Sequence, residues 1–296
     1  MNELNPVALD QPALQHTVPP AGPGRWHPAP LVQASFALHA LALPVLLLQP
    51  GEWPWVLGAL LANHLLLSTA VLFPRGRLLG PNMVRLPAAA VARGEVALTF
   101  DDGPDPQVTP QVLALLEARG LKASFFCVGA KAAAHPDLLR EIVRRGHSVE
   151  NHSQRHHPAF AFFGYAGLAR EVDAAQAAIA GITGRAPQFF RAPAGFRSPM
   201  LDPVLARRGL HYTSWTRRGF DAVERDPAKV LARLTCDLAA GDVLLLHDGG
   251  AALTRDGVPL VLAVLPALLE RIAAHGFQPV TLPAACGEQA VTERAG

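Results

Sequence analysis

The sequence predicts an α/β protein, a β/α barrel of about seven strand–helix units preceded by a hairpin of two transmembrane helices. Strand and helix signals alternate along the chain from Arg93 onward, which is the pattern of an α/β domain. Polar clusters follow almost every expected strand, where β/α barrels keep their active sites. Two apolar stretches before residue 75 contain no Asp, Glu, Lys or Arg, and each is about long enough to cross a bilayer as a helix.

The N-terminal region divides into a lead-in and the expected hairpin. Residues 1–30 are rich in proline and show little periodicity, so we expect a disordered lead-in. The apolar spans are 31–48 and 55–73, and the tight polar turn between them favours a transmembrane hairpin over 31–74. A signal peptide fits poorly, because the first apolar run starts late and no basic segment precedes it. Polar residues inside the spans are expected to bond between the two helices: His39, Asn63 and His64.

The basic flanks of the hairpin predict its orientation. Arg25 precedes it and Arg75, Arg77 and Arg85 follow it, whereas the turn has no Lys or Arg. The positive-inside rule then places both ends, and the domain downstream, on the cytoplasmic side of the inner membrane. The 3 cysteines form neither a disulfide framework nor a CxxC metal site, which favours buried thiols in a reducing compartment. A net charge of +2 without a basic run gives no sign of a nucleic-acid partner.

Residues 75–92 are expected to be a linker, residues 93–284 the α/β domain, and residues 285–296 a tail. The expected strands are rich in apolar or β-branched residues: 96–100, 123–128, 147–150, 188–191, 212–215, 242–247 and 277–281. The expected helices show helical spacing of apolar residues, and several stop at glycine: 109–119, 136–145, 167–181, 200–208, 227–238 and 258–275.

Two adjacent carboxylates, Asp101 and Asp102, follow the first of these strands. Neighbouring residues on a strand point to opposite faces, so the two can meet at one site only at a strand end. Side-by-side carboxylates repel each other, and a site that keeps both usually holds a cation or a shared proton. The alternative is an ordinary Asp-Asp-Gly-Pro turn that closes the strand.

A histidine cluster follows the third strand. His152 and His156 are four residues apart, so one helical turn would present both imidazoles to a divalent metal. A polar surface loop with incidental histidines is the alternative. Two histidines and one carboxylate leave open positions on a catalytic Zn²⁺ or similar ion, and Asp102 is the natural third ligand. Asp101 would then be free to take a proton from the attacking water.

Later strand ends add further polar residues. Arg191 could hold a carboxylate in its ionised form, or form an ordinary surface ion pair. Trp215 and Asp221 follow the next strand, where they could support the site or lie in an exposed loop. His247 ends a very apolar strand, as either a core residue or a general acid.

Four motifs together carry a family resemblance: TFDDGP at 99–104, HSQRH at 152–156, RAPAG at 191–195 and LLHDG at 245–249. Their order and spacing resemble those of the polysaccharide deacetylase, or NodB-homology, family, which is similar to carbohydrate esterase family four. The resemblance covers residues 93–284 and leaves the hairpin outside. It implies a distorted (β/α)7 barrel that removes N-acetyl, and sometimes O-acetyl or N-formyl, groups from sugars with a divalent metal.

The resemblance also implies a role for each matched residue. Asp101 would be the catalytic base and His247 the general acid, with Arg191 orienting the base. The remaining implied roles are the metal ligands Asp102, His152 and His156, the acyl-methyl pocket residue Leu245, the oxyanion amide of Ala194, and Asp221 as support for His247. Ala194 stands where the family often has an aromatic residue. The sequence Phe220-Asp221-Ala222 replaces the Asp-Trp pair typical of the fourth motif.

These observations predict a membrane-anchored, metal-dependent hydrolase that removes an N-acyl group, most simply N-acetyl, from a membrane-associated or lipid-linked sugar. Zn is the expected metal, with Co, Ni or Mn as alternatives. Membrane lipid would contact residues 31–74, and protein partners are not specified by the sequence. Alternative functions are a deformylase, an O-deacetylase, or an inactive carbohydrate-binding scaffold. A phosphatase with an Asp nucleophile would want an Asp-x-Asp pair and would leave the histidines unexplained.

Overall fold

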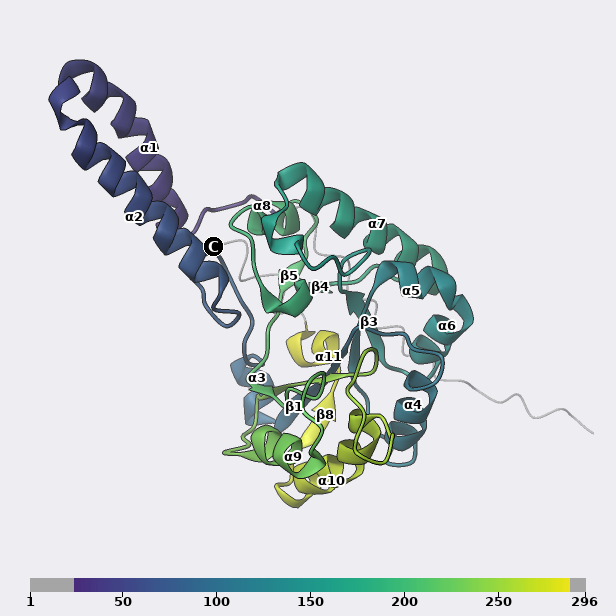
Figure 1. The fold of residues 1–296 in the computed structure, drawn as a ribbon. Coiled ribbons are helices and arrows are strands. Elements are labelled where there is room, and N and C mark those ends of the chain that lie inside the picture. The colour runs from purple at the N-terminus through teal and green to yellow at the C-terminus, as the bar shows by residue number, and fades with distance from the viewer. Residues whose placement is uncertain (1–23, 288–296) are drawn as a thin grey trace, which may run out of the picture.

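The computed structural model describes residues 24–287, so the expectations for residues 1–23 and 288–296 lie outside the described residues. Two long helices, α1 (Pro30–Leu48) and α2 (Trp53–Val71), form a hairpin that projects from the rest of the chain (Figure 1). A short 3₁₀ turn, η1 (Pro50–Glu52), joins them. The mean hydropathy of the two candidate spans is 2.0 and 1.4, and only 11% and 6% of them is buried, so they are not core helices. By length and composition, both helices could cross a membrane.

Polar side chains inside the hairpin bond between its helices, as expected. The Asn63 side-chain amide donates to Ser35 Oγ at 3.0 Å. The Nε2 atoms of His39 and His64 lie 3.4 Å apart. These contacts join α1 and α2 at polar positions inside the two apolar stretches.

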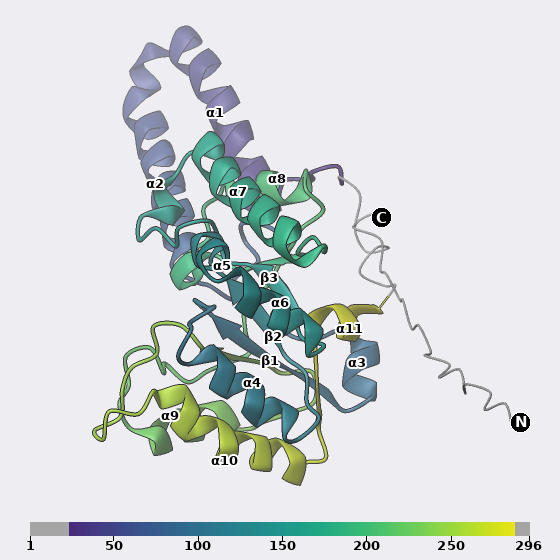
Figure 2. The ribbon, with the colours of Figure 1, turned by 90° about the vertical axis from the view of Figure 1, so that its right-hand side faces the viewer.

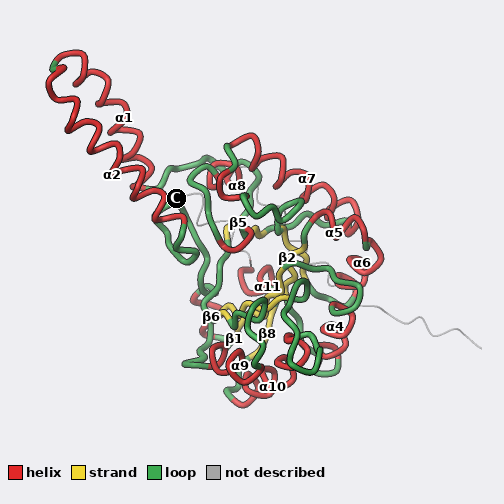
Figure 3. The backbone as a smooth tube through the Cα atoms, in the orientation of Figure 1, coloured by secondary structure: helices red, strands yellow, loops and turns green. Residues whose placement is uncertain are grey.

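The domain behind the hairpin is built on a curled parallel sheet with the strand order β5-β4-β3-β2-β1-β7-β6, with β8 pairing beside β1. Figure 3 shows the strands gathered in the middle with helices around them. The strands are β1 (Glu95–Asp101), β2 (Ser124–Cys127), β3 (Ser148–Asn151), β4 (Phe189–Phe190), β5 (His211–Tyr212), β6 (Arg217–Arg218), β7 (Val243–His247) and β8 (Gln278–Val280). This curled sheet confirms the distorted (β/α)7 barrel that the sequence predicts.

Helices follow most strands and cover the outside of the sheet, and several of them face the viewer in Figure 2. The longer ones agree with expectation apart from small shifts at their ends, and α3, α5 and α11 were not expected. The helices are α3 (Ala88–Ala92), α4 (Thr109–Glu117), α5 (Gly129–Ala134), α6 (Pro136–Arg144), α7 (Tyr165–Thr183), α8 (Leu201–Ala206), α9 (Pro227–Thr235), α10 (Leu260–Ala274) and α11 (Leu282–Cys286). Strand β6 was also missed, because two consecutive arginines give no apolar signal.

Alternation along β1 separates the core into two layers. Leu98 and Phe100 belong to the cluster between the sheet and the outer helices. Ala97 belongs to the cluster inside the barrel, together with Phe126 and Leu245. Because side chains alternate between faces, β1 delivers Thr99 and Asp101 to the barrel interior at its carboxyl end.

The segment expected to be a linker, 75–92, packs on the barrel and fills the gap between β5 and β6. Met83 forms a parallel bridge with Thr213, just after β5, and Arg85 an antiparallel bridge with Asp242, just before β7. The Thr216 hydroxyl donates to the carbonyl oxygen of Val84 at 2.7 Å. The chain between hairpin and first strand therefore helps to close the barrel.

Candidate active site

The two carboxylates of the first motif occupy the carboxyl end of β1. Asp101 is the last residue of the strand and is only 3% exposed. Asp102 follows in the left-handed region with φ 70°, which turns its side chain toward the same site. Gly249 packs against this turn, because a Cβ there would collide with the carbonyl oxygen of Asp102. This close approach accounts for the glycine of the LLHDG motif.

Asp102, His152 and His156 converge on one point, with their candidate ligand atoms within 4.8 Å of one another. The Oδ1 atom of Asp102 lies 3.1 Å from Nε2 of each histidine. The expected helical turn is wrong, because residues 152–157 form an irregular loop with positive φ at Ser153 and His156. Loop geometry, rather than helical spacing, brings the two imidazoles together.

Neighbouring groups orient His152 for metal binding. Its Nδ1 lies 2.9 Å from the carbonyl oxygen of Arg191. A carbonyl can only accept a hydrogen bond, so Nδ1 carries the proton and Nε2 of the neutral ring keeps its lone pair for a metal. The ring is 2% exposed, which holds this orientation.

The electrostatics of the cluster also fit a cation. Burial would raise the pKa of Asp102, but the contact with His152 and the charges of His152 and His156 outweigh it and hold that pKa far below its ordinary value. Burial would likewise lower the pKa of His152, but Asp101 and Asp102 raise it overall. Asp102 Oδ1 is buried without an aligned hydrogen-bond donor among the described residues, although both imidazoles contact it. The carboxylates thus draw positive charge to a buried point with N and O ligands, which suits a divalent metal.

Arg191 holds Asp101 from inside the barrel. Its Nη1 donates to Asp101 Oδ1 at 2.6 Å and to Thr99 Oγ1 at 3.0 Å, and Nη2 donates to the Ser214 carbonyl at 2.8 Å. The guanidinium is fully buried and lies 4.0 Å from the ring centroid of Phe126. Burial lowers the pKa of Arg191, and Asp101 opposes that shift. An arginine held by this many acceptors has a fixed position, and it orients the Asp101 carboxylate through a charge-assisted hydrogen bond.

His247 ends β7 directly beside Asp101, in register with it. Asp221 Oδ1 lies 2.9 Å from His247 Nδ1, and Oδ2 accepts from the His247 backbone amide at 2.7 Å. Nδ1 therefore faces a carboxylate, which leaves Nε2 for exchange with a substrate. Burial would lower the pKa of His247, but Asp221 raises it overall, with smaller help from Asp101 and Asp102. A raised pKa favours the protonated imidazole that a general acid requires.

The remaining predicted residues lie along one wall. Ala194 is exposed in the short turn η3 (Pro193–Gly195) and takes φ 54°. A Cβ on Gly195 would lie 2.5 Å from the Trp215 ring, so the ring supports this turn. Trp215 and Leu245 both belong to the interior cluster and are 6% and 1% exposed. The structure thus brings these residues to the same end of the barrel as Asp101.

Sequence reasoning missed three residues that contact the site. Asp248 is fully buried and accepts from Thr109 Oγ1 at 2.5 Å, and burial raises its pKa to about 7. Lys131 donates to the carbonyl oxygen of Asp102 at 2.7 Å. The side-chain amide of Asn82 links Ser214 to the chain leaving the hairpin. Asp248 could have been found from its place beside His247, whereas no local signal marks Lys131 or Asn82.

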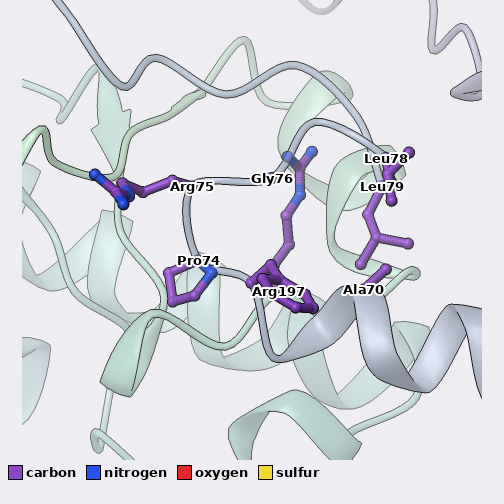
Figure 4. Close-up of a pocket in the computed structure, with 8 residues that line it drawn as sticks. Ala70, Pro74, Arg75, Gly76, Leu78, Leu79 and Arg197 are labelled. Atoms are coloured by element: carbon purple, nitrogen blue, oxygen red, sulfur yellow. The ribbon is translucent and has the colours of Figure 1, made fainter.

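A separate cavity of about 450 Å³ lies at the base of the hairpin (Figure 4). It is lined by Ala70, Phe73, Pro74, Arg75, Gly76, Leu78, Leu79 and Arg197. The guanidinium of Arg197 donates to the carbonyl oxygen of Gly80 at 3.0 Å and to Asp202 at 2.8 Å, which joins the segment after the hairpin to the barrel. No described ligand of the metal cluster lines this cavity, so we do not assign it to the catalytic site.

Comparison with known proteins shows which family this chain resembles. The model of the polysaccharide deacetylase family matches residues 88–213. The chain is 34% identical over 172 residues to a chitooligosaccharide deacetylase of Sinorhizobium fredii, covering 55% of this chain and 76% of that protein. It is 27% identical over 194 residues to a peptidoglycan-N-acetylglucosamine deacetylase of Bacillus cereus, covering 63% of this chain and 85% of that one.

A solved structure gives the same result. The family 4 carbohydrate esterase from Streptomyces lividans, in complex with acetate, superposes with a TM-score of 0.57 at 34% identity, over 63% of this chain and 91% of that one. The fold and site thus define a hydrolase of carbon–nitrogen bonds other than peptide bonds. The chain belongs to the polysaccharide deacetylase family. The match to the family model ends before Trp215, Asp221, Leu245 and His247, which the structure itself brings to the site.

Proposed function

We propose that the protein is a metal-dependent deacetylase that removes an N-acetyl group from a sugar. The observation that carries this proposal is the meeting of three candidate ligands with the Asp101–Arg191 and Asp221–His247 pairs at one end of the barrel. Asp102, His152 and His156 would hold the ion. Zn²⁺ suits one carboxylate and two imidazoles, and Co, Ni or Mn are alternatives with compatible ligands.

Each side chain of the site would have a separate role in the reaction. When bound, the ion would supply a Lewis acid and make the attacking water more acidic. Asp101, oriented by Arg191, would take the proton of that water as the C–O bond forms. His247 would give a proton to the nitrogen as the C–N bond breaks, so that an amine and acetate leave. The exposed backbone amide of Ala194 is the candidate donor to the developing oxyanion.

The acyl group would lie against the barrel interior. Leu245 and Trp215 provide an apolar wall beside the strand end, which suits a methyl group. The relatives named above act on chitooligosaccharides and on the N-acetylglucosamine of peptidoglycan. We infer that this chain takes an N-acetylated amino sugar of the same class.

The hairpin favours a sugar substrate that is located at a membrane. Two exposed apolar helices immediately before the barrel favour an anchor in the cytoplasmic membrane with lipid around residues 31–74. The substrate would then be membrane-associated or lipid-linked. The arginines that flank the hairpin favour a catalytic domain on the cytoplasmic side.

The experiment is an assay of the purified full-length protein in detergent with Zn²⁺. Substrates would be lipid-extracted and soluble polymeric glycans that carry N-acetyl, N-formyl or O-acetyl groups, with acetate and formate measured separately. The proposal expects acetate, with faster release from the lipid-extracted fraction. Formate release would identify a deformylase instead, and loss of ester-linked acetate alone an O-deacetylase. Sugar binding without turnover would support a scaffold, with Asp101→Asn as the inactive control.

A further inference from the structure

Arg218 is a cation near the active site that forms an ion pair with no carboxylate of the described part of the chain. No ion pair or side-chain hydrogen bond involves it among residues 24–287. Its Nε is buried and lacks a hydrogen-bond partner among those residues. The preceding residue, Arg217, is paired with Asp242 at 2.9 Å. A buried donor left unpaired costs free energy. Arg218 is only half-buried as a whole, so the rest of its guanidinium remains open to a partner from outside the chain.

The strand pairing places Arg218 at the active-site end of the barrel. Strand β6 runs parallel to β7, and Arg218 is in register with Leu245. Leu245 belongs to the interior cluster and is in register with Thr99 of β1, two residues before Asp101. Residues in register on neighbouring strands share a face, so Arg218 starts on the same face of the sheet as the acyl-pocket residue.

Two aromatic rings hold the guanidinium in place. Its central carbon lies 5.1 Å from the ring centroid of Trp215 and 4.8 Å from that of Phe220. The Trp215 ring also lies 5.9 Å from the guanidinium of Arg191, which holds the base. Phe220 directly precedes Asp221, which holds His247. Arg218 therefore lies between Trp215, which contacts the arginine that holds the base, and Phe220, which precedes the aspartate that holds the acid. The aromatic faces hold the guanidinium in place without neutralising its charge.

The Phe220 backbone adds an independent sign of a built site. It takes φ 63°, an unfavourable conformation for a bulky residue, and the residue is 45% exposed. Such strain persists where the surrounding structure fixes it, most often at functional sites. Here the strained residue presents its ring to Arg218 at the rim of the site.

The charged side chains assigned to the base, the acid and the candidate metal site already face one another. Asp101 is matched by Arg191 and Asp221 by His247, while Asp102 faces the two candidate metal-ligating histidines. We propose that Arg218 binds an anionic group of the substrate, a phosphate or carboxylate carried by the sugar that loses its acetyl group. A guanidinium suits both anions, because its fork of N–H groups can bind two oxygens at once. The inference rests on the proposed deacetylase function and specifies its substrate class.

The test compares three N-acetylglucosamine oligosaccharides of equal length: a neutral one, one ending in a phosphate, and one bearing a carboxylate. The measured quantity is the ratio of kcat/KM for each anionic substrate to that for the neutral one. The wild type should prefer an anionic substrate, and Arg218→Gln should lower that ratio by roughly 10- to 100-fold, the range expected for a lost charge-assisted hydrogen bond. Arg218→Lys should restore part of the preference, because it keeps the charge but not the fork.

Arg233→Gln is the matched control. Arg233 also lies by Phe220, at 5.6 Å, but it is paired with Glu224 at 3.2 Å, so its loss removes one positive charge from the same surface without removing an unpaired one. In Arg233→Gln, the ratio of kcat/KM for the anionic substrates to that for the neutral one should equal the wild-type ratio. Thermal melting of each variant shows whether it folds. If Arg218→Gln does not fold, Arg218→Lys is used in its place.

The outcomes separate the two proposals. Preference for the phosphate or for the carboxylate identifies the source of the anion. A wild type that prefers the neutral sugar, or an Arg218→Gln ratio equal to that of the wild type, overturns the role of Arg218 while deacetylation stands. If no substrate is turned over, the proposed function fails. Calorimetric affinity for the phosphorylated sugar, wild type against Arg218→Gln, then still decides whether Arg218 binds an anion.

Discussion

Asp221 holds His247 at two points, accepting from its backbone amide at 2.7 Å and contacting its imidazole Nδ1 at 2.9 Å. One carboxylate therefore fixes both the position of the strand end and the orientation of the ring. Asp221 is fully buried, which strengthens its interaction with the ring. The loop sequence around it lacks the family's usual Asp-Trp pair, yet the contact with the histidine is present.

The Asp221–His247 contact predicts a shift of the pH–rate profile. Burial alone would lower the pKa of His247, and Asp221 is the main group that raises it. In Asp221→Asn the burial effect should prevail, so the imidazole loses its proton at lower pH and the alkaline limb moves down in pH. Rates from pH 5 to 10 would show this. An alkaline limb unchanged from the wild type would remove Asp221 from control of His247.

The acid and base should be separable from the metal ligands. Asp101→Asn and His247→Ala each remove a proton-transfer group, so kcat should fall by roughly 10²–10⁴-fold while metal content stays at the wild-type level. Steady-state kinetics and elemental analysis on the same samples measure both. Loss of metal from either variant would mean that the residue belongs to the ligand set.

Much of this site was predictable because the chemistry is concentrated at strand ends. Asp101, Asp102 and His247 follow apolar strands that the sequence marks clearly, and parallel strands bring their carboxyl ends to one edge. The sequence also predicted that His152 and His156 lie together, but it predicted this from a helical turn that the structure does not have. Their loop depends on left-handed residues whose positions no helical periodicity encodes.

Other features depend on contacts between residues far apart in sequence. Strand β6 consists of two arginines, so its place in the sheet comes from pairing with β7 rather than from its composition. Asn82 lies in a stretch without a motif and reaches Ser214 only after the chain folds. Such partners cannot be inferred from spacing along one sequence.

Asn82 should be a structural link between the hairpin exit and the base. Its Nδ2 donates to the carbonyl oxygens of Pro74 and Gly76, and its Oδ1 accepts from Ser214, whose own carbonyl accepts from Arg191. Asn82→Ala removes these three hydrogen bonds, one of them to the buried Ser214 hydroxyl, and should lower the free energy of unfolding by about 1–3 kcal/mol.

Chemical denaturation of the full-length protein in detergent measures this loss, and kcat should fall with it. Ser214→Ala, which removes one of the three bonds, is the matched comparison and should cost less. Equal stability of Asn82→Ala and the wild type would show that the segment after the hairpin is a passive tether.

The orientation of the hairpin gives a prediction about compartment. The flanking arginines predict that both ends of the hairpin face the cytoplasm. A reporter fused after Gly296 that is active only in the cytoplasm should therefore give signal, and one active only outside should not. Signal from the outside reporter alone would place the barrel, and its substrate, on the outer side.

Metal content and acetate release, measured on the same protein samples, test the proposed metal-dependent deacetylation most directly. The wild type should carry a stoichiometric divalent metal, lose both metal and turnover to a chelator, and regain both when Zn²⁺ is returned. Asp102→Ala, His152→Ala and His156→Ala should each lose metal and release no acetate, because each removes one of three converging ligands. If all three variants retained stoichiometric metal, or if chelated wild type still released acetate at its full rate, the assigned metal site would be wrong.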